Sequence, residues 1–172
     1  MTVNRGKKFE SVVRASFERV PGVSIDRLHD QTTRYKGSTN ICDFIVYKKP
    51  YEHYIECKSV HGNTMAIFAT DEKHKYGNIT NAQWEGLLNK SKINGVSAGV
   101  LIWFVDCDIT VYYPITALQE IRDCGNKSIR FDTFHPDRIY VCGEKKRVFY
   151  DYYMKDFLDD LAWKVKGYES KH

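Results

Sequence analysis

The chain has 172 residues, of which 42% are hydrophobic and 28% charged, and its formal net charge is +4 at pH 7. These values are ordinary for a folded domain and exclude a disordered or collagen-like chain, while the mild positive charge favours a polyanion as partner. No apolar stretch approaches the roughly 20 residues that span a bilayer, and the N-terminus lacks the apolar core of a signal peptide. We therefore expect one soluble cytoplasmic domain over residues 1–172.

An amphipathic helix is predicted over residues 4–20, ended by Pro21-Gly22, because its apolar residues recur at helical spacing along one stripe. Glu10 borders that stripe, so its carboxylate can reach the edge of the core. The alternative for Glu10 is a solvated ion pair with Arg14, four residues further on.

Residues 23–28 predict a first strand, and a polar segment follows up to residue 40. Arg34, Tyr35 and Lys36 form a basic and aromatic cluster in this segment, which is suited to a DNA backbone or an unpaired base. A plain surface loop is the alternative interpretation.

A β-hairpin is predicted over residues 41–59, because apolar and polar residues alternate on both sides of the breaker Lys48-Lys49-Pro50. A fold about the Lys49–Pro50 bond places Asp43 opposite Glu56. The two-residue period of a strand then puts Lys58 on the same face as Glu56, while Cys42 and Cys57 face the core.

Two directly opposed carboxylates repel each other unless a cation lies between them. Mg²⁺ suits this position, since it takes carboxylate oxygens, keeps several waters and binds substrate phosphates; Mn²⁺ is expected to substitute. Asp43, Glu56 and the main-chain carbonyl of Cys57 are the candidate ligands. Lys58 is placed to hold an attacking water or to offset charge on a phosphate, which indicates phosphodiester hydrolysis.

The rest of the chain adds helices and strands that complete a sheet. A charged loop over residues 70–78, containing Lys73 and Lys75, is either solvated or a DNA clamp. Helices are predicted from residue 80 to Asn94-Gly95, with Ile93 facing inward, and over residues 114–123 and 154–166. Strands are predicted over residues 98–105, 109–113, 138–142 and 147–151, the last two joined by a turn over residues 143–146. The order predicts an α/β sandwich with a central mixed β-sheet flanked by helices.

Asp43, followed by Glu56-Cys57-Lys58 on a hydrophobic strand, resembles the motif of the PD-(D/E)XK nuclease superfamily. Further motifs resemble RecU-type Holliday-junction resolvases in the same order along the chain: Asn4-Arg5-Gly6 before the helix with Glu10, Asn63-Thr64 after Lys58, and Gln83-Trp84-Glu85 before an apolar strand. The resemblance implies a restriction-endonuclease-like fold with a catalytic core over about residues 4–105. The remainder is then scaffold, dimer surface or DNA contact.

The resemblance also implies roles for two further residues. Glu10 would assist the metal, commonly through water, and Gln83 would orient the scissile phosphate or a water molecule. Without the resemblance, Gln83 is an unremarkable residue in the first turn of a helix. One departure from the RecU pattern is clear, because a long stalk precedes the catalytic aspartate in those proteins and only Asp30 to Asn40 stands there in this chain.

The implied function is a Mg²⁺-dependent DNA endonuclease that resolves Holliday junctions in recombination and repair, acting as a homodimer with two sites. The alternatives are another PD-(D/E)XK nuclease, of restriction or branch-cutting type, and a structure-specific DNA-binding module without catalysis. The candidate DNA contacts are basic residues around the predicted site: Arg5, Lys7, Arg34, Lys36, Lys73 and Lys75.

Overall fold

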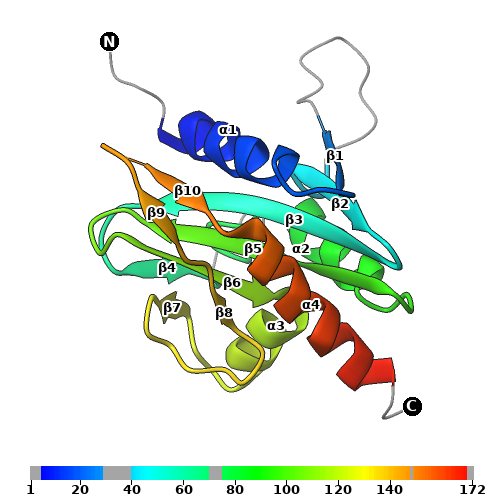
Figure 1. The fold of residues 1–172 in the computed structure, drawn as a ribbon. Helices are drawn as coiled ribbons and strands as arrows, with labels where there is room; N and C mark the ends of the chain where they lie inside the picture. Colours follow the sequence, from blue (N-terminus) through cyan, green and yellow to red (C-terminus); the bar gives the residue numbers. More distant parts are fainter. Residues whose placement is uncertain (1–4, 29–39, 70–74, 148, 170–172) are drawn as a thin grey trace, which may run out of the picture.

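The computed structural model describes residues 5–28, 40–69, 75–147 and 149–169 (Figure 1). The helices are α1 (Arg5–Glu18), α2 (Asn81–Lys90), α3 (Ile115–Asp123) and α4 (Met154–Glu169). The strands are β1 (Ser24–Arg27), β2 (Phe44–Lys48), β3 (Tyr51–Val60), β4 (Thr64–Ala66), β5 (Val96–Phe104), β6 (Ile109–Pro114), β7 (Ser128–Arg130), β8 (Ile139–Tyr140), β9 (Gly143–Lys145) and β10 (Tyr150–Tyr152). None of the helices within these ranges is long and apolar enough to cross a membrane.

Six strands form the central sheet in the order β1-β2-β3-β5-β6-β8, and two further pairs, β4 with β7 and β9 with β10, lie outside it. All neighbours in the central sheet are antiparallel except β3 and β5. A parallel pair needs a long crossover connection, and the chain between β3 and β5 contains α2. The sheet is therefore mixed, as the sequence predicted.

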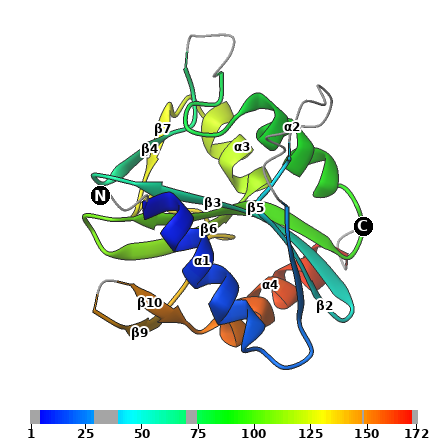
Figure 2. The same cartoon turned by 90° about the horizontal axis from the view of Figure 1, so that it is seen from above.

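Helices cover both faces of the sheet (Figure 2). Side chains alternate between the faces, so Tyr54, Val100 and Ile102 join a core with α2, α3 and the β4–β7 pair. Their neighbours Ile55, Cys57 and Leu101 join a second core with α1 and α4. This arrangement confirms the predicted α/β sandwich with a central mixed sheet.

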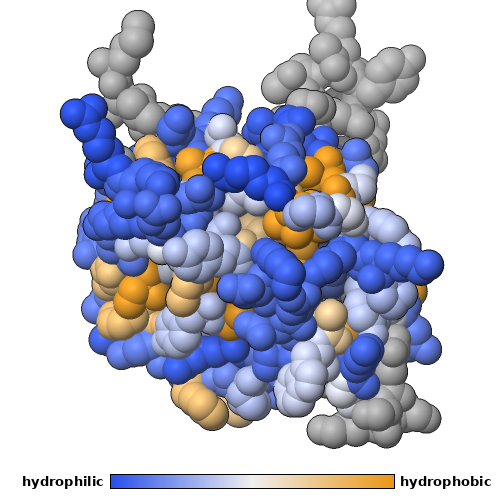
Figure 3. All heavy atoms as spheres, in the orientation of Figure 1, coloured by the Kyte–Doolittle hydropathy of each residue, from blue (hydrophilic) through white to orange (hydrophobic). Residues whose placement is uncertain are grey.

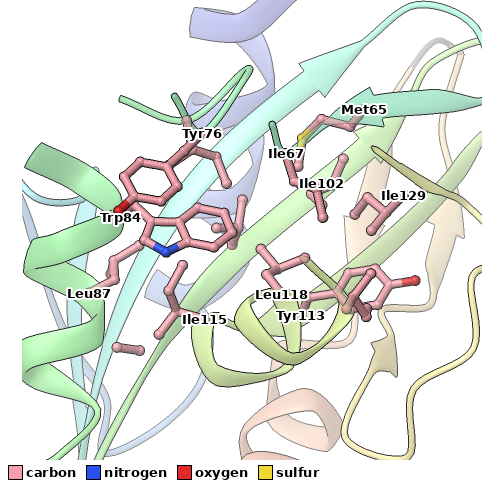
Figure 4. Close-up of a cluster of buried hydrophobic side chains, with 14 of the residues drawn as sticks. Met65, Ile67, Tyr76, Trp84, Leu87, Ile102, Tyr113, Ile115, Leu118 and Ile129 are labelled. Carbon is pink, nitrogen blue, oxygen red and sulfur yellow. The ribbon is translucent and has the colours of Figure 1, made fainter. Parts of the chain in front are cut away.

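The core beneath α2 and α3 combines aliphatic side chains with a few aromatic rings (Figure 4). Trp84 of α2 is fully buried, and its ring stacks on Tyr76 at a centroid distance of 4.6 Å and an interplanar angle of 5°. The Trp84 indole N–H donates to Gln119 of α3 at 2.9 Å, which ties the two helices together. This packing fixes α2 on the sheet, and with it the residues in its first turn.

The core beneath α1 and α4 follows the predicted apolar stripe. Phe9, Val13 and Phe17 of α1 are buried, as are Phe157 and Leu158 of α4. The outer surface in the view of Figure 3 is mainly hydrophilic, with small hydrophobic patches between charged and polar residues.

Three details differ from the sequence predictions. Helix α2 ends at Lys90, so Ile93 lies in the following turn with 51% of its surface exposed instead of facing inward. The expected turn over residues 143–146 contains β9, which pairs with β10. Gly143 suits this strand because a Cβ there would lie 2.5 Å from the Asp151 carbonyl oxygen. Strands β4 and β7, which pair with each other, were not predicted.

Candidate active site

The hairpin of β2 and β3 brings the two predicted acids together. Phe44 pairs with Ile55, and the same register carried one step further places Asp43 opposite Glu56. The Asp43 N–H donates to the Ile55 carbonyl at 3.2 Å, and Asp43 Oδ2 accepts a hydrogen bond from the Cys57 N–H at 2.7 Å. The side chain of Asp43 is thus held against β3 at the point where β2 begins.

Glu56 is the centre of this cluster and is only 2% exposed. Its Oε1 accepts hydrogen bonds from Lys58 Nζ at 2.8 Å and from Gln83 Nε2 at 2.7 Å. Its Oε2 is buried and has no hydrogen-bond partner among the described residues. A buried carboxylate oxygen without a partner is costly, so this atom is available to a ligand that supplies positive charge.

Burial and like charge both act on the acids. Burial raises the pKa of Glu56 to about 8; Lys58 opposes this increase, whereas Asp43 and Glu10 add to it. Burial also raises the pKa of Asp43, against the lowering effects of the Cys57 N–H and Lys58. The pair therefore resists carrying two negative charges side by side unless a cation joins them.

Gln83 reaches the site from the first turn of α2, where a capping box holds it. The Thr80 hydroxyl accepts from the Gln83 N–H at 3.2 Å, and the Thr80 N–H donates to Gln83 Oε1 at 3.1 Å. Gln83 Oε1 also accepts from Lys58 at 3.3 Å. The structure thus brings Gln83, singled out by family resemblance, to both Glu56 and Lys58.

Glu10 approaches the site from α1, with its side chain 17% exposed. Its carboxylate is paired with Arg27 at the end of β1, and Arg14 pairs with Glu18 at 2.8 Å. The alternative of a Glu10–Arg14 pair is therefore wrong. Arg27 also lowers the pKa of Asp43, so it belongs to the electrostatics of the site although the sequence analysis did not select it.

The donor set fits a hard cation of the Mg²⁺ type. No group of three or more His, Cys, Asp or Glu side chains within the described ranges forms a ready-made metal cage. Mg²⁺ does not require one, because it usually binds through one or two carboxylates, several waters and substrate phosphates. Asp43 and Glu56 supply two carboxylates, and the unpartnered Oε2 of Glu56 is an oxygen that a cation would satisfy.

The main chain of Cys57 adds a further oxygen. The N–H and C=O of one strand residue point to the same side, and the Cys57 N–H points to Asp43. The Cys57 carbonyl is therefore directed to the same side of β3, past the beginning of β2. The thiol of Cys57 is buried in the core beneath α1, so only the carbonyl suits a metal.

The predicted DNA contacts are placed only in part. Arg5 is exposed at the start of α1, and its guanidinium lies 3.3 Å from the imidazole of His61, which follows β3. Lys7 is exposed on the same helix. Lys75 pairs with Glu85 at 2.9 Å and its ammonium lies over the Tyr76 ring at 4.8 Å. Arg34, Lys36 and Lys73 lie outside the described residues.

Comparisons with known proteins give distant likenesses, all of them among solved structures. No protein-family model matches the sequence, and no curated protein matches it. A solved structure that resembles the chain is Hjc, a Holliday junction resolvase from the archaeal hyperthermophile Archaeoglobus fulgidus. The identity is 16% and the TM-score 0.44, over 65% of this chain and 78% of that chain. At this level of similarity, function has to be inferred from the chemistry of the site itself.

Proposed function

We propose that this protein is a divalent-metal-dependent DNA endonuclease that hydrolyses phosphodiester bonds. The observation that carries the proposal is the buried Glu56, opposed to Asp43 across the hairpin, with one carboxylate oxygen unpartnered and the other bound by Lys58 and Gln83. Two acids, a lysine and an amide on one side of a sheet can hold a metal, place a water and offset charge on a phosphate, which are tasks of metal-assisted phosphodiester cleavage.

The residues divide the chemistry between them. Asp43, Glu56 and the Cys57 carbonyl would hold the metal, and Glu10 would assist through water. When bound, the metal supplies a Lewis acid for a phosphoryl oxygen and positive charge for the transition state. Lys58 holds the attacking water or offsets charge that develops on the phosphate. Gln83 orients the water or the scissile phosphate, and the first turn of α2 adds the positive end of the helix dipole.

We further propose that the substrate is a four-way junction, resolved during recombination and repair. This part rests on the resemblance of the motifs around Asn4, Gln83 and Asn63 to those of RecU-type resolvases. A resolvase cuts two strands symmetrically, so a homodimer that presents two sites fits the task.

The test is cleavage of a synthetic four-way junction beside a linear duplex of the same sequence, each with Mg²⁺ or with EDTA. We expect paired symmetric nicks in the junction, no cutting of the duplex, and no activity in EDTA. Cutting of both substrates would support the proposal of a nuclease and contradict the proposal of a junction-specific resolvase. Binding without cutting in Mg²⁺ or Mn²⁺ would reject the enzyme.

Metal binding can be measured without activity. A ligand that binds the folded state at 100 times its Kd stabilises it by about 2.7 kcal/mol, which corresponds to roughly 5–10 °C in Tm for a chain of this size. We expect such an increase with Mg²⁺ or Mn²⁺, reversed by EDTA and absent in Asp43→Asn. Equal increases in the wild type and this variant would place the metal elsewhere.

A nuclease for linear or otherwise branched DNA is the second candidate. It is favoured by the short segment Asp30 to Asn40, which stands where RecU-type proteins carry a stalk. Such an enzyme would use the same residues at the site and differ only in its substrate.

A further inference from the structure

A hollow with aromatic walls lies at the edge of the central sheet that ends with β8. Its volume is about 380 Å³, within the range of small-ligand sites, and it opens between β6, β8 and the β9–β10 pair. Phe131, Tyr140 and Tyr150 line it, together with Thr110 and Cys142. We call this hollow the aromatic groove.

A cation lies over each of these three rings. Arg130 lies 5.9 Å from the centroid of Phe131, Arg138 lies 4.9 Å from Tyr140, and Lys145 lies 5.9 Å from Tyr150. Arg130 is paired with Asp132, and Lys145 with Asp108. These two cations are therefore largely neutralised.

Arg138 differs from the other two cations. Its guanidinium donates hydrogen bonds to two main-chain carbonyls, those of Asp132 at 2.8 Å and Thr133 at 2.5 Å. These bonds fix the guanidinium. Arg138 contributes to the lowered pKa of Asp132, but no carboxylate among the described residues lies within ion-pair distance of Arg138, so its charge is less neutralised than those of Arg130 and Lys145. It is therefore the cation of the groove best suited to attract an anion.

Arg138 also organises the rim of the groove. Its guanidinium lies 5.4 Å from the ring centroid of Phe134, so the cation has contacts with both Phe134 and Tyr140. Phe134 is 75% exposed and Tyr140 is 44% exposed. Exposed aromatic rings beside a fixed arginine are the combination on which unpaired bases stack, while the cation attracts the phosphates.

The register of the sheet relates the aromatic groove to the candidate active site. Lys58 pairs with Ile102, Ile102 with Val111, and Val111 with Tyr140. Directly paired residues share a face of the sheet, so Tyr140 is on the same face as Lys58, three strand spacings or about 14 Å away. This span corresponds to about four 3.4 Å steps along one strand of a duplex.

The β4–β7 pair packs over the intervening Ile102 and Val111, as Met65 and Ile129 join the same core (Figure 4). On its outer side this pair exposes Thr64, Ser128 and Arg130. A nucleic-acid strand that runs from the acids to the groove would therefore cross the hydroxyl groups of Thr64 and Ser128, which are ordinary phosphate contacts.

We propose that the aromatic groove binds an unpaired segment of a DNA strand, with one base in the hollow and a neighbouring base stacked on Phe134. This inference rests on the proposed nuclease and, among its candidate substrates, favours branched DNA with a single-stranded region close to the cleaved bond over a fully paired four-way junction. A fully paired duplex would fill the active site and leave the groove empty.

The test is fluorescence anisotropy in EDTA, with a blunt duplex and the same duplex carrying a single-stranded tail. We expect the wild type to prefer the tailed DNA. Phe134→Ala should weaken binding of tailed DNA by roughly 5- to 150-fold, the range for loss of one stacked base, and leave blunt-duplex binding unchanged. Phe134→Trp should retain the preference, since indole also stacks.

Tyr47→Ala is the matched control, because Tyr47 is 46% exposed and lies on β2, toward the opposite edge of the sheet. It should bind both DNAs as the wild type does. The proposal for the aromatic groove would be overturned if the wild type bound tailed and blunt DNA with equal affinity. It would also be overturned if Phe134→Ala and Tyr47→Ala lost equal affinity for tailed DNA.

Cleavage with Mg²⁺ is scored separately, so that the two proposals can fail independently. If the wild type cuts DNA and Phe134→Ala binds tailed DNA with full affinity, only the proposal for the aromatic groove is rejected. If the wild type never cuts DNA but prefers tailed DNA, and Phe134→Ala loses this preference, the proposal for the groove is supported and the proposal of a nuclease is rejected.

Discussion

At the scale of single residues, the feature that most needs explanation is Glu56. A carboxylate that is 2% exposed, next to a second acid, reduces the stability of the folded chain unless its charge is balanced. Lys58 balances one oxygen and leaves the other without a partner within the described residues. A purely structural acid would be better replaced by an apolar residue, and this is the reason for which we propose that Glu56 binds a metal.

We expect Asp43→Asn and Glu56→Gln each to lower the single-turnover cleavage rate by at least about 100-fold, because each removes a metal-binding charge worth several kcal/mol in the transition state. Folding and DNA affinity should change little, since neither substitution alters side-chain volume much. Quenched-flow or gel assays at saturating enzyme measure the rate.

Glu52→Gln is the control for these variants, because Glu52 is on the same strand but accepts its hydrogen bond from Tyr54, away from the acids. It should cleave like the wild type. If either Asp43→Asn or Glu56→Gln also cleaved at the wild-type rate, the site would be assigned to the wrong residues.

At the scale of elements, the hairpin and α2 assemble the site by local rules. The breaker at Lys49-Pro50 and the alternation in β2 and β3 determined the register that opposes Asp43 and Glu56, and both were readable from the sequence. The position of Gln83 depends on the crossover that packs α2 on the sheet. No local pattern encodes that contact, so only the family resemblance selected Gln83.

The features that the sequence analysis did not predict have physical causes at the same scale. Arg27 reaches Glu10 across 17 residues of sequence, and a strand pattern does not specify which partner a charged side chain meets. Gly143-Glu144-Lys145 has the composition of a turn, and its extended form comes from pairing with β10. Ile93 continued the apolar spacing of α2, but the helix had already ended at Lys90.

The capping box of α2 offers a test at this scale. Thr80→Ala removes the acceptor of the Gln83 N–H, so we expect a loss of about 1 kcal/mol in the free energy of unfolding. The first turn should also hold Gln83 less firmly, which would lower the cleavage rate by up to about tenfold. Thr80→Ser keeps the hydroxyl and should retain both the wild-type stability and the wild-type cleavage rate. An unchanged cleavage rate in Thr80→Ala would show that the capping box does not contribute to catalysis.

At the scale of the whole molecule, the two cores make different contributions. The core beneath α2 and α3 contacts the strand face that carries Glu56 and Lys58, and the core beneath α1 and α4 supports it from behind. His53 lies on that rear side, 1% exposed, with its Nδ1 2.6 Å from the Ser97 hydroxyl. The stability of the sheet thus depends on a buried imidazole in its central strand.

Burial lowers the pKa of His53 from 6.5 to about 4, with a smaller contribution from Lys48. In the unfolded chain His53 takes up a proton below about pH 6.5, whereas the folded chain resists protonation down to about pH 4. The contribution of His53 is therefore fully present above pH 6.5 and is lost as the pH falls toward 4, by up to about 3 kcal/mol. Urea unfolding at intervals between pH 4 and 7.5, in EDTA, measures this slope.

His53→Gln isolates this group, because glutamine can keep a hydrogen bond to Ser97 and does not titrate. Other groups, including Glu56 and Asp43, titrate in the same interval and contribute equally to both proteins, so the difference between the two curves belongs to His53. We expect this difference to change by up to about 3 kcal/mol across the interval, with the wild type losing more stability in acid. Parallel curves would show that His53 has the same pKa in the folded and the unfolded chain, which contradicts a pKa lowered by burial.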